Sequence, residues 1–83
     1  MRLLPNPVVD LLTLQLRLPE AGQARLSVFD VAGREVAPVL DGSLTAGGHA
    51  VSWKAAPAQA GGVYYARLAT SRGMRTEPFI LLR

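Results

Sequence analysis

The chain has 83 residues, 49% of them hydrophobic and none of them cysteine, and its nine basic and six acidic residues give a net charge of +3. This length fits one small domain that needs its apolar residues for a core, so a deep substrate pocket and an enzymatic role are not expected. The basic residues are scattered and do not form the clusters that follow a phosphate backbone, which argues against nucleic-acid binding. No apolar stretch approaches the ~20 residues that a transmembrane helix needs.

Short β-type runs alternate with turn-forming residues along the chain. Leu12, Leu14 and Leu16 are spaced by two residues, which predicts a strand with one buried face. The same period recurs in the later runs, and turns that contain glycine or proline separate them. Strands are therefore expected, in chain order, at residues 11–18, 24–30, 35–40, 49–54, 63–70 and 74–83.

Several local features refine this pattern. Pro38 lies inside the third run, and because proline cannot donate to a ladder, this strand is expected at a sheet edge or at a bulge. Residues 41–48 and 55–62 have turn chemistry and are predicted to be loops. Residues 1–4 precede a Pro-Asn-Pro interruption, so they are expected to be a linker or simply the start of the chain.

The last predicted strand ends on the continuous apolar stretch Phe79 to Leu82. Such a stretch is typical of a strand buried on both faces or of one capped by a neighbouring chain. An uncovered apolar edge there would favour a homodimer. With no helical period anywhere, the expected fold is all-β: an immunoglobulin-like antiparallel β-sandwich of about six or seven strands, forming one domain over residues 1–83.

The side-chain inventory predicts no catalytic residue, metal site or cofactor. His49 is the only histidine, so a zinc site built from histidine and cysteine is excluded. Ser52 follows three residues later and points to the opposite face of the strand, which prevents a Ser-His pair. Asp30 and Glu35 flank a turn too tight for a sugar, and they are interpreted as turn-stabilising residues with Arg34 as an ion-pair partner.

The aromatic residues are expected to serve the core. Trp53 shares a strand face with Val51 and is a core candidate. Tyr64 and Tyr65 are adjacent in a strand and therefore point to opposite faces, so they do not form a sugar-binding platform. Arg67 is predicted on the same face as Tyr65.

The order of several segments resembles a known family. These segments are Pro5-Asn6-Pro7, the turn Leu18 to Gly22, the strand Ala24 to Asp30, the hairpin Asp30 to Val36, Leu44 to His49, Gly62 to Leu68, and the closing Phe79 to Arg83. In this order they resemble the C-terminal sorting domain of the type IX secretion system of Bacteroidetes. They are also similar to the related immunoglobulin-like domain of flagellar hook-capping proteins.

The resemblance implies a non-catalytic domain that directs its host protein through the outer-membrane translocon to the cell surface or the medium, by way of the periplasm. It implies two partners, the type IX translocon and a sortase-like surface peptidase, and it implies no cofactor. The residues that it points to for protein recognition are Gly33, Arg34, Glu35, Phe79, Ile80, Leu81, Leu82 and Arg83.

An alternative function stays open at this point. A small immunoglobulin-like sandwich also suits a structural module, or a glycan- or protein-binding accessory module, of a secreted enzyme. Binding of the isolated domain to glycans would favour this alternative, whereas export of a grafted passenger would favour sorting.

Overall fold

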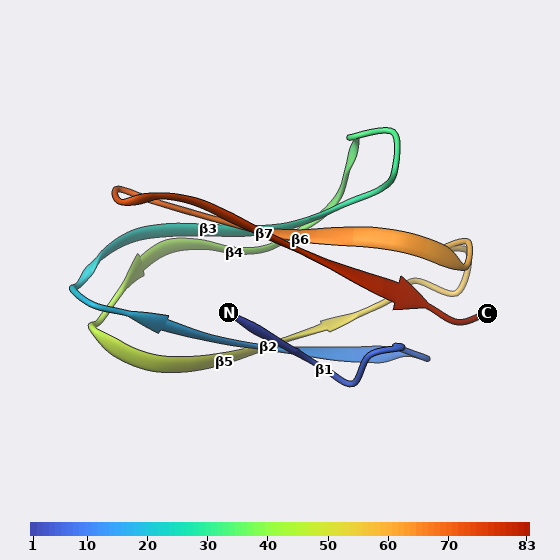
Figure 1. Cartoon of the computed structure of the whole chain (residues 1–83), viewed down its shortest axis with the longest axis horizontal. Helices are drawn as coiled ribbons and strands as arrows, with labels where there is room; N and C mark the ends of the chain where they lie inside the picture. Colours follow the sequence, from blue (N-terminus) through green and yellow to red (C-terminus); the bar gives the residue numbers. More distant parts are fainter.

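Alternation of apolar and polar side chains along the long strands produces two antiparallel sheets that stack face to face (Figure 1). The computed structural model describes residues 1–83 and contains no helix, so nothing in the chain could cross a membrane as a helix. The strands are β1 (Arg2–Leu4), β2 (Leu11–Leu18), β3 (Gly22–Phe29), β4 (Glu35–Leu44), β5 (Gly47–Lys54), β6 (Gly62–Thr70) and β7 (Gly73–Leu81).

The strand order confirms the predicted sandwich. One sheet has the order β1-β2-β5 and the other the order β4-β3-β6-β7. An immunoglobulin constant-type sandwich places its first, second, fifth and fourth strands in one sheet and its third, sixth and seventh in the other. The present chain follows this scheme except that the fourth strand, β4, belongs to the second sheet, where it lies at the edge next to β3.

The core lies between the two sheets and contains the side chains that alternation assigned to it. Leu12, Leu14 and Leu16 of β2 are buried, and Trp53 of β5 is also buried on the same side of its sheet. The facing sheet contributes inward residues from β3, β6 and β7. The complete cluster comprises Val8, Leu12, Leu14, Leu16, Leu18, Ala24, Leu26, Val28, Trp53, Ala55, Tyr64, Ala66, Leu68, Phe79 and Leu81.

Strand β4 is longer than the sequence predicts. The expected loop at 41–48 is wrong, because β4 continues to Leu44 and only residues 45 and 46 join it to β5. The reason is β3, whose first half provides partners for the second half of β4, from Gly22 opposite Leu44 to Leu26 opposite Leu40. The prediction for Pro38 is confirmed, because β4 is an edge strand and its register shifts on both sides of that residue.

The N-terminal residues belong to the sandwich. The expectation of a linker at residues 1–4 is wrong, because Arg2–Leu4 forms β1 and pairs with Thr13 to Gln15 of β2. This strand has three residues, which is too short for a detectable alternation, and its pairing with β2 stabilises it.

The terminal strand is not buried on both faces, as was one expectation for it. Phe79 and Leu81 are almost fully buried, whereas Ile80 and Leu82 are 47% and 49% exposed. The C-terminal end of this strand is covered at its edge by an N-terminal segment of the same chain. Val8 donates its backbone N–H to the Ile80 carbonyl and accepts from the Leu82 N–H, both at 2.7 Å.

Candidate recognition site at one end of the sandwich

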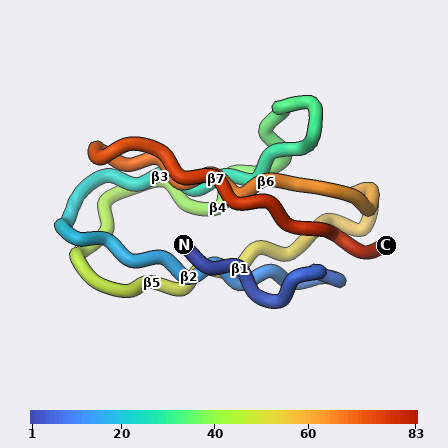
Figure 2. The backbone as a smooth tube through the Cα atoms, viewed as in Figure 1, coloured from blue at the N-terminus to red at the C-terminus, as the bar shows by residue number.

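The segments singled out by sequence lie at one end of the molecule. Figure 2 shows the β3–β4 connection projecting from the sandwich near the end where the β5–β6 loop and the C-terminus also lie. Asp30 to Arg34 on one side and Gln59 to Tyr64 on the other line a hollow of about 300 Å³. Arg83 packs on the far side of the same loop, close to Gly61.

The β3–β4 hairpin is held rigidly by Asp30. Its Oδ1 accepts hydrogen bonds from the backbone N–H groups of Ala32, at 2.9 Å, and Arg34, at 3.0 Å. Its Oδ2 pairs with Arg34 Nε at 3.2 Å, which confirms the expected Asp30–Arg34 ion pair. Gly33 has φ +81°, a backbone conformation that side chains with a Cβ rarely adopt. The hairpin is therefore a preformed projection.

Glu35 has a different role from its neighbours in the hairpin. Its carboxylate pairs with Arg25 Nη2 at 2.8 Å, and Arg25 also approaches Asp41 at 3.7 Å. These contacts join β3 to β4 on the outer face of the sheet. The sequence interpretation of Glu35 as a residue that stabilises the turn through Arg34 is therefore wrong. Glu35 is the first residue of β4, and its carboxylate pairs with Arg25 and not with Arg34.

A buried tyrosine anchors the β5–β6 loop. The Tyr64 hydroxyl donates to the Ala60 carbonyl at 2.5 Å and accepts from Gln59 Nε2 at 2.8 Å. A tyrosine at the start of the sixth strand that bonds to the backbone a few residues upstream is the tyrosine corner of immunoglobulin-type domains. The corner fixes the loop that separates the hairpin from the C-terminal tail.

The tail divides its side chains between the core and the surface. Phe79 and Leu81 point inward, so they cannot contact a partner while the domain is folded. Ile80, Leu82 and Arg83 point outward, and Arg83 Nη1 donates to the Pro57 carbonyl at 3.2 Å. Five of the eight residues predicted for recognition belong to the tail. Three of these five are therefore available at the surface.

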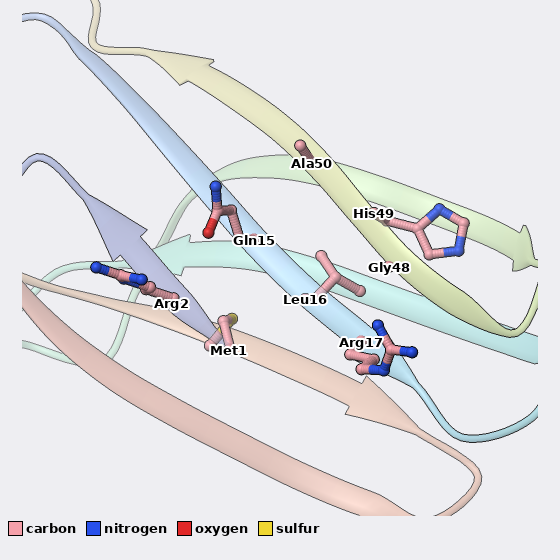
Figure 3. Close-up of a pocket in the computed structure, with 8 residues that line it drawn as sticks. All are labelled: Met1, Arg2, Gln15, Leu16, Arg17, Gly48, His49 and Ala50. Carbon is pink, nitrogen blue, oxygen red and sulfur yellow. The ribbon is translucent and has the colours of Figure 1, made fainter.

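A larger hollow lies elsewhere and contains none of these residues. It is a trough of about 500 Å³ on the outer face of the three-stranded sheet, with Arg2 and Gln15 side by side and Arg17 beyond them (Figure 3). Gly48 and Ala50 line the trough, and their small side chains leave space between the longer side chains around them. Its two arginines make none of the four ion pairs of the chain, so the trough can attract anions.

The acidic groups of the hairpin region predict a pH dependence of stability. The Arg34 N–H holds the pKa of Asp30 below its ordinary value of 3.8, and the Arg25 hydrogen bond holds the pKa of Glu35 below 4.5. At a pH between the pKa of such a carboxyl in the folded chain and its pKa in the unfolded chain, the unfolded chain binds more protons. The free energy of unfolding must therefore fall as the pH decreases through this range. The stabilisation is complete above the unfolded pKa values and is lost as pH falls through the folded ones.

We expect the urea midpoint of the chain to fall between about pH 6 and about pH 3, and an Asp30→Asn, Glu35→Gln double variant to show a flatter profile. Above about pH 6 the two profiles should run parallel. A double variant with the same acid dependence as the parent chain would contradict the assignment of these two carboxylates.

Comparison with family models, with curated proteins and with solved structures gives no match to this chain. No group of three or more His, Cys, Asp or Glu side chains is close enough to hold a metal ion. Function therefore has to be inferred from the residues and their arrangement.

Sequence reasoning missed two features near the site. One is the cover of β7 by Asn6 to Val8, for which the only signal was the short apolar pair Val8-Val9 after the Pro-Asn-Pro segment. The other is the stacking of Arg67 Cζ over the Phe29 ring, at 4.4 Å from its centroid. Alternation predicts which side of its own strand each of Phe29 and Arg67 occupies. It cannot predict that β3 and β6 are neighbours in the sheet, which brings the two side chains together.

Proposed function

We propose that the chain is a non-catalytic sorting domain that directs a host protein through the type IX secretion system to the cell surface or the medium. The observation that carries the proposal is that two segments distant in sequence lie next to one loop. Arg34 of the hairpin and Arg83 of the tail lie on either side of the same β5–β6 loop. Both segments are ones that the resemblance connects with recognition.

The physical form of this end suits recognition by another protein. The hairpin is fixed by three hydrogen bonds to the Asp30 carboxylate, and the loop by the Tyr64 hydroxyl. A rigid surface loses little conformational entropy on binding, which favours affinity. The outward tail residues Ile80 and Leu82 add apolar contact area beside a cation, Arg83.

The test is export of a passenger. A reporter with an export signal for the inner membrane at its N-terminus and this chain at its C-terminus would be expressed in a bacterium with a type IX system and in a strain that lacks the translocon. The reporter should reach the surface or medium only in the first strain, and the reporter without the domain should stay in the periplasm in both.

Equal export from both strains, or retention in both, would contradict the sorting role. The alternative, an accessory binding module, predicts retention together with binding of the pure domain to a glycan array. Glycan binding without export would therefore replace the sorting proposal with that alternative.

A further inference from the structure

The outer face of the four-stranded sheet has an apolar surface that carries a single free cation. We call it the Arg67 face, and it comprises Phe29, Val63, Tyr65, Arg67, Pro78 and Ile80. These residues are neighbours across three strands, because Phe29 pairs with Tyr65, Tyr65 with Pro78 and Val63 with Ile80. Val63 and Ile80 are 41% and 47% exposed.

Arg67 is held in place but its charge has no partner. Its guanidinium lies 4.4 Å above the centroid of the Phe29 ring, a distance at which cation and ring attract each other. Its Nε is buried and makes no hydrogen bond, and none of the four ion pairs of the chain includes it. Because Nε is shielded from solvent, a carboxylate from outside would bind the terminal Nη groups, and it would supply the charge partner that Arg67 lacks.

The chain has no carboxylate of its own for this position. The register neighbours of Arg67 are Ser27 on β3 and Thr76 on β7. The nearest acidic pair on this face, Glu35 and Asp41, is engaged by Arg25. Glu77 is opposite Ala66, which faces the core, so its side chain leaves the sheet on the other side.

We propose that the Arg67 face binds a polypeptide segment that presents one carboxylate between apolar side chains. The planar guanidinium offers two parallel N–H donors to a carboxylate, and Phe29 fixes the plane in which they lie. Tyrosine, phenylalanine and arginine are the residues that protein interfaces concentrate at their centres. Apolar side chains of the partner would cover Tyr65 and Ile80.

A polypeptide fits better than a nucleic acid or another polyanion. A polyanion is bound by several cations placed along its backbone. Here Arg67 is the only unpaired cation within the face, and its neighbours carry no charge. The inference does not depend on the sorting role, because it concerns binding by the pure domain and not export.

The test uses two pentapeptide probes that differ in one group. In an extended Ac-Leu-Thr-Glu-Thr-Leu-NH2, both leucines and the glutamate share one face, and the control peptide carries Gln instead of Glu. Binding would be followed by NMR on the ¹⁵N-labelled chain, through the Arg67 Nε–H signal and the backbone amides of Tyr65 and Ile80. The Glu peptide should bind in the millimolar range and the Gln peptide about ten-fold more weakly.

Two variants distinguish binding at the Arg67 face from a general effect of the positive charge of the domain. Arg67→Gln should weaken binding of the Glu peptide by about ten-fold, whereas Arg75→Gln, which removes the same charge from an exposed position facing the other way, should change it less than about two-fold. The amide spectrum shows whether each variant is folded.

The proposal fails if both peptides bind equally, if neither shifts the Arg67 signal, or if the shifts map to the trough around Arg2 and Arg17. It also fails if a polyphosphate probe binds the Arg67 face more tightly than the Glu peptide does. Concentration-dependent shifts of the same signals without peptide would show that a second copy covers the face, which would overturn the proposal as well.

Discussion

A Phe79→Ala variant should lose about 3–5 kcal/mol of unfolding free energy, most of what holds a domain of this size together. Phe79 is 1% exposed and lies where the two sheets meet near the tail. Its ring contacts Trp53 edge-on at a centroid distance of 6.0 Å and stacks with Tyr64 at 5.9 Å. Truncation would leave a cavity between two rings that β-sheet hydrogen bonds prevent from moving together.

Urea unfolding followed by the fluorescence of Trp53, the only tryptophan, measures this effect at the contact itself. The matched control is Ile80→Ala at the next position of the same strand. Ile80 is half exposed, so its truncation should cost about 1 kcal/mol or less. Similar losses for the two variants would contradict the inward and outward assignment of the tail.

A Val8→Asp variant should be destabilised by at least about 3 kcal/mol, because it places a carboxylate without a partner in the core. Val8 is fully buried, and its backbone is bonded to Ile80 and Leu82 at the edge of β7. Forcing residue 8 out of the core would break these bonds. The Leu82 amide should then exchange with solvent faster than amides in the middle of β6.

The neighbouring Val9→Asp provides the control. Val9 is 64% exposed, so the same substitution there should change the unfolding free energy by about 0.5 kcal/mol or less. If Val8→Asp were as well tolerated as Val9→Asp, the N-terminal segment would not cover the terminal strand, and the edge of β7 would be free to pair with another chain.

Much of the fold follows from local sequence pattern. The period of two placed Leu12, Leu14 and Leu16 in the core and assigned Tyr64 and Tyr65 to opposite faces. These assignments succeed because one buried face makes the register of a strand unambiguous. Pro38 at an edge follows equally directly from its missing N–H donor.

The errors have a common physical cause, which is pairing between distant residues. β1 and the second half of β4 carry weak local signals and exist because β2 and β3 provide partners for them. Phe79 to Leu82 is apolar at every position because both outward positions also carry Ile or Leu, and this continuity does not imply burial on both faces. Its cover by Val8 joins residues more than 70 positions apart, which no local pattern could predict.

The candidate site was predictable in its parts but not as a whole. The resemblance named the hairpin residues Gly33 to Glu35 and the tail residues Phe79 to Arg83. It could not separate Phe79 and Leu81, which build the core, from the outward Ile80 and Leu82. Nor could it show that hairpin and tail flank one loop, since this depends on how the two sheets stack.

The division of the tail decides how the sorting proposal has to be tested. Deleting residues 79–83 would remove two core side chains, so lost export could reflect unfolding alone. A triple variant with Ile80→Ser, Leu82→Ser and Arg83→Ser changes only outward side chains and leaves Phe79 and Leu81 in place. The control is Val9→Ser, Leu11→Ser and Arg75→Ser, three exposed positions outside the tail.

The most direct measurement is the fraction of a fused passenger that reaches the cell surface or medium in a host with an intact type IX translocon. With the domain folded in every case, the tail variant should reduce this fraction by about ten-fold or more, and the control variant should export like the parent. Undiminished export of the folded tail variant would contradict the claim that the outward side chains of the terminal strand are recognised.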